Sequence, residues 1–209
     1  MKKILFTIFT LVFLTTAFAQ KPNEVRGSMG IEFVSVPSLT DYLQANYTGQ
    51  LNSFSSAVNF SGSYGRLISP TTQLEGEVSY LLNSYNSTLD LGTYDLTYSI
   101  IMPSVLYYYM LNGNGYYFKF GGGAGARFLS ATEKLPADPN NYNYFAQGFG
   151  FILRAAGNTA ISENFYAYIS ADFRYDNLKK INLGGDVNNT SVNFSSLSLG
   201  VRLGISYQF

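Results

Sequence analysis

The chain has 209 residues, with 13 basic and 13 acidic side chains, no histidine, no cysteine and no tryptophan, and only 12% of its residues are charged. The lack of cysteine excludes disulfides and lipid attachment through a cysteine, and the balanced charge offers no basic surface for nucleic acid. With 18 tyrosines and 17 phenylalanines, so weakly charged a chain needs lipid against much of its surface. After Phe18 no apolar run reaches the about 18 to 20 residues of a membrane-spanning helix.

The first 19 residues are predicted to be a cleaved secretory signal peptide. Lys2 and Lys3 precede an apolar stretch that ends near Phe18, and Ala17 and Ala19 occupy the small-residue positions that signal peptidase needs. Cleavage after Ala19 leaves one mature domain, residues 20–209. Losing Lys2 and Lys3 from 13 basic residues leaves 11 against 13 acidic residues, a net charge of −2.

Eight segments of the mature chain alternate between apolar and polar residues, the period of a strand with two unlike faces. The last is the clearest, because every odd position from Leu197 to Phe209 is apolar or aromatic. In the fourth, the even positions from Leu96 to Tyr108 are expected to face outward, and Pro103, which cannot donate to the ladder, is expected to cause a bulge. The predicted strands are residues 25–36, 54–67, 73–85, 94–110, 116–130, 144–156, 165–177 and 197–209.

Long connectors follow the odd-numbered strands and short connectors follow the even-numbered ones. The turn at Asn112–Gly115 is typical of a tight hairpin, because Asn-Gly tolerates positive φ angles. The first long connector holds the only helix-like piece, with Ser38 as its cap and Leu39, Tyr42 and Leu43 on one side. The alternation of long and short connectors is typical of an outer-membrane barrel with both termini and the short turns in the periplasm. The other long connectors are residues 86–93, 131–143 and 178–193.

We therefore predict an all-β fold, an eight-stranded antiparallel up-and-down transmembrane β-barrel with a polar lumen. The alternation turns twelve charged side chains inward, six of each sign. Such a lumen is just wide enough for its own side chains, and an unpaired buried charge is costly, so a salt-bridged plug is the leading interpretation and an ion or proton path the alternative. The twelve residues are Arg26, Lys119, Arg127, Arg154, Arg174 and Arg202 with Glu32, Glu75, Glu77, Asp95, Asp172 and Asp176.

The residue types argue against an enzyme. Small outer-membrane barrels that act as proteases or phospholipases use a histidine, which this chain lacks, and serine without histidine or cysteine has no usual activating partner. Glu75 and Glu77 form a carboxylate pair, but on an inward strand face they are expected to pair with Arg or Lys rather than to act on glycosides. Residues 121–126 match a dinucleotide-binding spacing without the helix that should follow. No cofactor, metal or nucleic acid is expected.

On these features the mature chain resembles the small eight-stranded outer-membrane barrels, a group that includes the OmpA transmembrane domain, OmpX, OmpW and the outer-membrane β-barrel domain proteins of Gram-negative bacteria. The resemblance implies an integral outer-membrane location and contact with outer-membrane lipids and lipopolysaccharide. It also implies that the last strand is read by the outer-membrane assembly machinery, with Leu203, Ile205, Tyr207 and Phe209 as the signal.

Three roles stay open at this point. The first is a structural, adhesive or envelope-maintenance role exerted through extracellular loops, without catalysis. The second is an OmpW-like channel for small apolar solutes, against which the charged lumen argues. The third is an accessory barrel of a secretion or surface-assembly machine, acting through an envelope protein partner.

Overall fold

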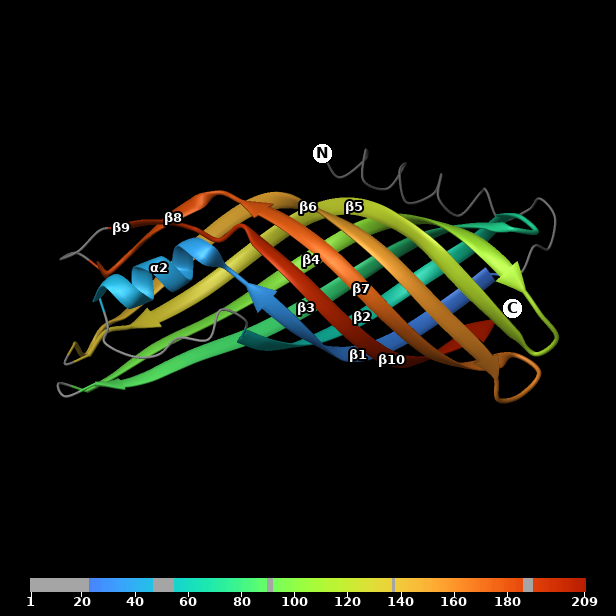
Figure 1. The fold of residues 1–209 in the computed structure, drawn as a ribbon, viewed down its shortest axis with the longest axis horizontal. Helices are drawn as coiled ribbons and strands as arrows, with labels where there is room; N and C mark the ends of the chain where they lie inside the picture. The colour runs from blue at the N-terminus through green and yellow to red at the C-terminus, as the bar shows by residue number, and fades with distance from the viewer. Residues whose placement is uncertain (1–22, 47–54, 90–91, 137, 186–189) are drawn as a thin grey trace, which may run out of the picture.

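Eight antiparallel strands close into a barrel in the computed structural model, in the spatial order β1, β10, β7, β6, β5, β4, β3, β2 (Figure 1). This is the predicted up-and-down barrel. The structure describes residues 23–46, 55–89, 92–136, 138–185 and 190–209, so Ala17 and Ala19 lie outside the described residues. The barrel strands are β1 (Asn23–Ser35), β2 (Ser55–Ser69), β3 (Thr72–Leu89), β4 (Gly92–Asn112), β5 (Tyr116–Lys134), β6 (Asn141–Ala160), β7 (Phe165–Leu178) and β10 (Ser196–Gln208), and the remaining elements are α2 (Pro37–Asn46), β8 (Lys180–Leu183) and β9 (Thr190–Asn193).

The barrel has two unlike ends. The turn end carries the turns that join β2 to β3, β4 to β5 and β6 to β7, together with Asn23 and Phe209, whose backbones exchange hydrogen bonds of 2.7 and 3.0 Å. The loop end carries α2 and the hairpin of β8 and β9 (Figure 1). In the turn after β4, Gly115 has a φ of 79° and the N–H of Gly113 donates to the carbonyl of Tyr116 at 2.8 Å. The hairpin predicted from Asn112–Gly115 is confirmed.

Two of the predicted long connectors are largely strand. Residues 86–93 continue β3 and β4, with Asn86 opposite Asp95 and Ser87 opposite Tyr94, so that only residues 90–91 separate the strands. Likewise β5 runs to Lys134 and β6 begins at Asn141. The ladder is made by backbone groups, so it continues here although the outward side chains become polar. These polar side chains are the reason that the sequence predicted connectors.

An apolar belt surrounds the turn-side half of the wall. On β10 the outward side chains Leu199, Val201, Leu203 and Ile205 are all exposed. Exposed apolar side chains continue on the other seven strands, which is the outer face expected of a barrel in lipid. Separately, α2 is neither long nor apolar enough to cross a membrane, and the same holds for any other helix within the described residues.

The predicted orientation of β4 is wrong. Its even positions face the interior, where Leu96 and Tyr98 are at most 3% exposed, while the odd positions Ile101 and Val105 are 48% and 57% exposed. The first part of β4 stands beyond the belt, and there the interior is apolar and the exterior is polar. The apolar positions of that part therefore point inward, and following them along the strand gave the wrong face.

The bulge predicted at Pro103 is not present either. Ile101 lies opposite Phe128 and Ser104 opposite Gly125, which is one unbroken register on β5. The strand accommodates the missing donor by leaving a gap in the ladder beside Pro103 rather than by inserting a residue.

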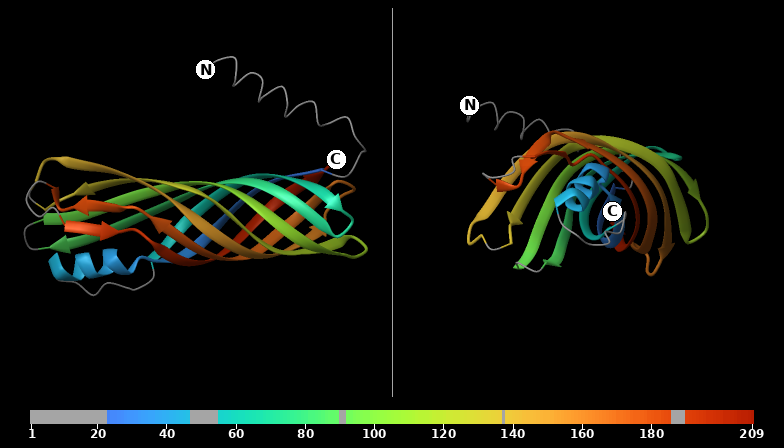
Figure 2. Two further views of the ribbon diagram at one scale, coloured as in Figure 1. Left: turned by 90° about the horizontal axis from the view of Figure 1, so that it is seen from above. Right: turned by 60° about the vertical axis from the view of Figure 1, so that its left-hand side comes forward.

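At the loop end, α2 and the β8–β9 hairpin close over the inner face of the long strands (Figure 2). The helix begins at Pro37, a residue suited to the first helical position, and the N–H of Thr40 donates to the carbonyl of Val36 at 3.0 Å. Ser38 therefore lies within the first turn. The prediction that it caps the helix is wrong. The predicted side of the helix is buried in one apolar cluster. That cluster contains Val34, Val36, Leu39, Tyr42, Leu43, Ala57, Leu81, Tyr94, Leu96, Tyr98, Ile100, Met102, Leu129, Ala131, Leu178, Ile181, Leu183, Val192 and Phe194.

Candidate functional site

The interior of the turn-side half holds a network of charged side chains. Eleven of the twelve charged residues expected in the lumen are at most 4% exposed. They project from β1, β3, β5, β6, β7 and β10, so their ion pairs connect opposite sides of the wall across the lumen.

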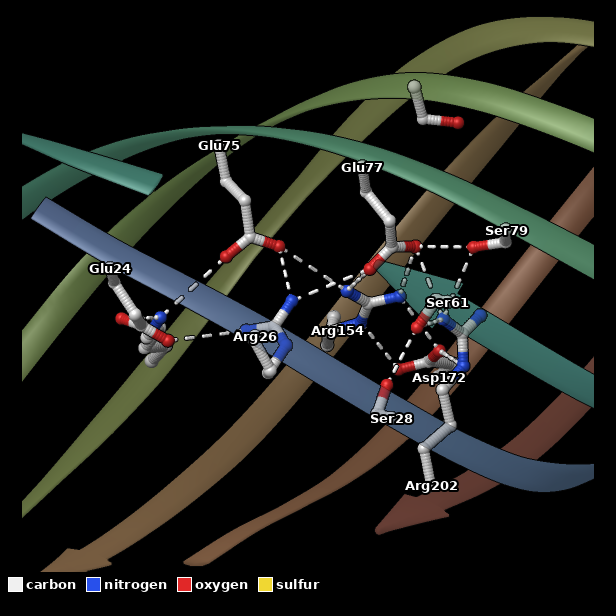
Figure 3. Close-up of polar contacts among 12 residues, drawn as sticks. Glu24, Arg26, Ser28, Ser61, Glu75, Glu77, Ser79, Arg154, Asp172 and Arg202 are labelled. Carbon is white, nitrogen blue, oxygen red and sulfur yellow. Dashed lines mark hydrogen bonds and ion pairs between the residues drawn. The ribbon is translucent and has the colours of Figure 1, made fainter. Parts of the chain in front are cut away.

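Two arginines and two carboxylates form the centre of the network (Figure 3). Arg154 donates to Glu77 at 2.6 and 3.0 Å and to Asp172 at 2.8 and 3.0 Å. Arg202 reaches the same carboxylates, with Nη1 3.1 Å from Glu77 and Nε 2.8 Å from Asp172. Each carboxylate is thus shared by two guanidinium groups, and charge-assisted pairs of this bidentate kind are the strong ones.

Ion pairs extend from this centre toward the turn end (Figure 3). Arg26 contacts Glu75 and lies 3.4 Å from Glu77. The Lys119 Nζ lies 2.6 Å from Glu24 and 3.6 Å from Glu75. Sequence reasoning missed the buried Glu24, because the predicted first strand begins at Val25 whereas β1 begins at Asn23. The alternation of β1 places the carboxylate of Glu24 inward.

Other ion pairs extend toward the loop end. Arg174 donates to Glu32 at 2.9 Å, and Arg202 donates to the same oxygen at 3.0 Å. Arg127 pairs with Asp176 nearby. The network therefore reaches the edge of the apolar cluster, since Arg174 also contacts the sulfur of Met102, a member of that cluster.

Asp95 is not part of the network. It faces outward on β4 beyond the belt, where the side-chain amide of Asn86 donates to it and Lys134 lies opposite on β5. The error follows from the wrong orientation of β4. With Glu24 in place of Asp95, the network holds six cations and six carboxylates, which keeps the balance that burial of charge requires.

The glycine-rich part of β5 makes room inside the barrel. Gly121 and Gly123 face inward beside Tyr108 and Leu106 of β4, and a Cβ on either glycine would collide with the backbone of β4. The stretch stays in the strand throughout. These glycines therefore serve lumen packing, and the turn into a helix that a dinucleotide site needs does not occur here.

The carboxylates of the network are occupied by cations. Glu75 and Glu77 each lie against cations, an arrangement that neutralises charge. Among the residues described by the structure, no three His, Cys, Asp or Glu side chains are grouped so that they could hold a metal ion.

A second polar site lies at the loop end, around the buried carboxylate of Glu133 on β5. It accepts hydrogen bonds from the hydroxyls of Tyr42, Tyr94 and Tyr144 at 3.1, 2.8 and 3.0 Å. The backbone N–H of Gly184 donates to it at 2.9 Å. The donors come from α2, β4, β6 and the segment after β8, so one carboxylate holds the helix and the hairpin to the wall.

Burial and the negative charge of Glu133 raise the pKa of Tyr144, which stands beyond the belt, to about 12. Its hydroxyl therefore stays protonated, and a donor, at physiological pH. Sequence reasoning missed Glu133 because it fell in the predicted connector 131–143. The inward series Arg127, Leu129, Ala131 continues directly to it.

The residues expected to form the assembly signal line the outer face of β10 at the turn end. Leu203, Ile205, Tyr207 and Phe209 are all exposed on that face, and the rings of Tyr207 and Phe209 stack with centroids 5.9 Å apart. Their role in assembly stays a prediction.

No protein-family model matches the chain, and no match is found among curated proteins. Solved structures are similar in fold. The attachment invasion locus protein Ail of Yersinia pestis, in complex with the heparin analogue sucrose octasulfate, is 12% identical with a TM-score of 0.54, covering 91% of this chain and 100% of that chain. Neisserial surface protein A is 15% identical with a TM-score of 0.52, covering 90% of this chain and 97% of that chain. The protein thus has the fold of the small eight-stranded outer-membrane β-barrels.

Proposed function

We propose that this protein is a non-enzymatic outer-membrane barrel whose lumen is closed to ions and whose work is done at its capped loop end. The observation that carries the proposal is the network centred on Arg154 and Arg202. The interior of an eight-stranded barrel is just filled by side chains. Here those side chains pair by charge from the turn end to the apolar cluster.

The barrel is proposed to stand with its loop end outside the cell and its turn end in the periplasm, in contact with outer-membrane lipids and lipopolysaccharide. Short periplasmic turns and longer outer loops are typical of such barrels. The outward side chains beyond the belt, such as Thr97 and Thr132, are exposed and polar, which suits a part of the wall that projects into water. Leu203, Ile205, Tyr207 and Phe209 are proposed as the signal for the assembly machinery.

The loop end supports a structural, adhesive or envelope-maintenance role. Glu133 and the apolar cluster fix α2 and the β8–β9 hairpin against the wall, and a rigid surface loses less conformational entropy when it binds a partner. An OmpW-like channel for apolar solutes is less well supported, because the apolar part of the interior is filled by these same elements. An accessory role in a secretion machine would use the same surface, and purification from detergent-solubilised outer membrane tests it by the partner recovered.

Conductance tests the closed lumen. We expect the purified barrel to give no steady current in planar bilayers, while it migrates as a heat-modifiable band on gels. A known porin is the positive control. Steady conductance of the folded barrel would show that the lumen is a hydrated channel and that the proposal is wrong.

Cysteine labelling tests the orientation, and the cysteine-free chain suits it. Asp138→Cys places a thiol at the loop end and Glu163→Cys places one at the turn end. In intact cells a membrane-impermeant maleimide should label only the first variant, and both should react after the outer membrane is permeabilised. The reverse pattern would contradict the proposed orientation.

A further inference from the structure

A cavity of 360 Å³ lies in the wall at the loop-side border of the belt. Its outer lining is Phe128 of β5, Phe145 and Gln147 of β6, and Lys179 and Lys180 after β7. On its inner side it reaches Leu129 and Ala146, which belong to or pack against the apolar cluster. Phe128 stands opposite Gln147, and the N–H of Lys179 donates to the carbonyl of Gln147 at 3.1 Å. Three neighbouring segments thus bring two aromatic rings and two amines together.

The depth of this cavity is that of a lipid headgroup. On β5 the outward series passes from Phe128 to Ser130, Thr132 and Lys134, so the belt ends at Phe128. Phe145 is 76% exposed, the highest value among the exposed large apolar side chains of the described residues. An acyl chain can cover these rings, while the space beyond them faces water and polar headgroups.

The charge of the cavity is positive. Lys179 and Lys180 are both exposed, and no carboxylate is part of the lining. A lysine can lay its stem on apolar surface and keep its ammonium group in water. The cavity therefore suits a ligand that is apolar on one side and anionic on the other.

We propose that this cavity binds a phosphorylated glycolipid of the lipid A type, with an acyl chain against Phe128 and Phe145 and a phosphate between Lys179 and Lys180. A phosphate monoester carries about −1.5 to −2 charges at neutral pH, which two lysines match, whereas the phosphodiester of a phospholipid carries a single charge. The inference rests on the proposed orientation, because only with the loop end outside does the cavity face the outer leaflet.

Native mass spectrometry of the detergent-purified barrel tests this with three probes: lipid A with both phosphates, the same glycolipid without phosphate, and phosphatidylglycerol. We expect the phosphorylated glycolipid to bind at least about ten-fold more tightly than the other two. A lysine near an anionic membrane surface contributes about five-fold to binding, so Lys179→Gln with Lys180→Gln should weaken binding by about thirty-fold. Lys134→Gln, which removes another outward lysine of the loop end, is the matched control and should leave binding unchanged. Phe145→Ser should weaken binding of the phosphorylated and dephosphorylated glycolipids alike.

Equal binding of the dephosphorylated glycolipid would overturn the proposal, as would equal binding of phosphatidylglycerol. An equal loss in the Lys134→Gln control would show diffuse charge attraction instead of a site. If the double lysine variant changed oligomeric state, the surface would be a contact between copies. Maleimide labelling of Asp138→Cys and Glu163→Cys in intact cells reports on the proposed orientation separately, so failure of either idea is distinguishable from failure of the other.

Discussion

The two halves of the barrel wall use opposite alternation. In the turn-side half, the outward Val201 and Leu203 are apolar and the inward Arg202 is charged and buried. In the loop-side half, the inward Leu96 is apolar and buried while the outward Thr97 is exposed. Alternation therefore reports which medium each face meets. It does not by itself report which face is the lumen.

The halves also differ in the interactions that stabilise their interiors. The turn-side interior contains buried charges that neutralise one another, and the loss of one partner leaves another uncompensated. The loop-side wall behaves like a soluble sheet, with water outside and a core completed by α2 and the β8–β9 hairpin. The same kind of substitution should consequently have unequal effects in the two halves.

The largest expected effect is that of Arg154→Met. The change leaves Glu77 and Asp172 with one fewer guanidinium partner each, and breaking a buried pair typically costs about 3 to 5 kcal/mol. The measurement is the free energy of unfolding by urea in lipid vesicles, followed by the heat-modifiable gel band. Lys134→Met, an outward change outside the network, should stay within about 0.5 kcal/mol of wild type.

A double variant separates charge pairing from loss of packing. Arg154→Met combined with Asp172→Leu removes one of the stranded charges, and it should recover part of the lost stability, because removal of both partners can be nearly neutral. If Arg154→Met alone were as stable as wild type, the interior would be hydrated and the plug interpretation would fail.

The next prediction compares the same substitution, to arginine, on the outer faces of the two halves. Leu203→Arg places a charge on the belt and should cost about 2 to 4 kcal/mol if the position lies near the bilayer midplane. Thr97→Arg makes the same addition on the outer face of the loop-side half, where it meets water, and should change stability by no more than about 0.5 kcal/mol. Equal costs in the same urea assay would mean that the two outer faces meet the same medium.

Outside β4, the sequence was sufficient to predict the turn-side half, whereas Leu106 and Tyr108 of β4 were predicted to face outward and are buried. Strict alternation from Leu197 to Phe209 and the Asn-Gly turn before Tyr116 give strand, face and hairpin by local rules. It was insufficient where the surroundings changed along one strand. The apolar positions Leu96 and Tyr98 point inward because they meet α2 and the hairpin, and no local rule on β4 contains that information.

A moderate effect is expected for Glu133→Gln. The amide keeps one acceptor oxygen but brings an N–H₂ group among the hydroxyls of Tyr42, Tyr94 and Tyr144, leaving donors unmatched at about 1 to 3 kcal/mol. Hydrogen exchange should become faster in α2 and the β8–β9 hairpin and stay unchanged in the turn-side strands. Glu163→Gln at the turn end is the control. Uniform acceleration over the whole barrel would contradict a local fastening of the loop end.

The convergence on Glu133 shows what the sequence could not supply. Glu133 and Ala131 lie on the same inward face of β5. Alternation predicts this face when the strand is extended past residue 130 to Lys134. The donors Tyr42 and Gly184 lie 91 and 51 residues away along the chain. Contacts of that separation depend on how the connectors fold back over the loop end, and periodicity in a single strand says nothing about them.

The smallest effect on stability, with a large one on assembly, is expected at Phe209. Its ring is 57% exposed and that of Phe165, on the same girdle, is 47% exposed, and both rings contact Tyr207. Truncation of either to alanine should therefore cost a similar amount, about 1 kcal/mol, once the barrel is formed. If the assembly machinery reads the last strand, Phe209→Ala should lower the heat-modifiable fraction in outer membranes several-fold while Phe165→Ala leaves it near wild type. Because burial is matched between the two sites, equal assembled levels would show that Phe209 contributes only interfacial packing.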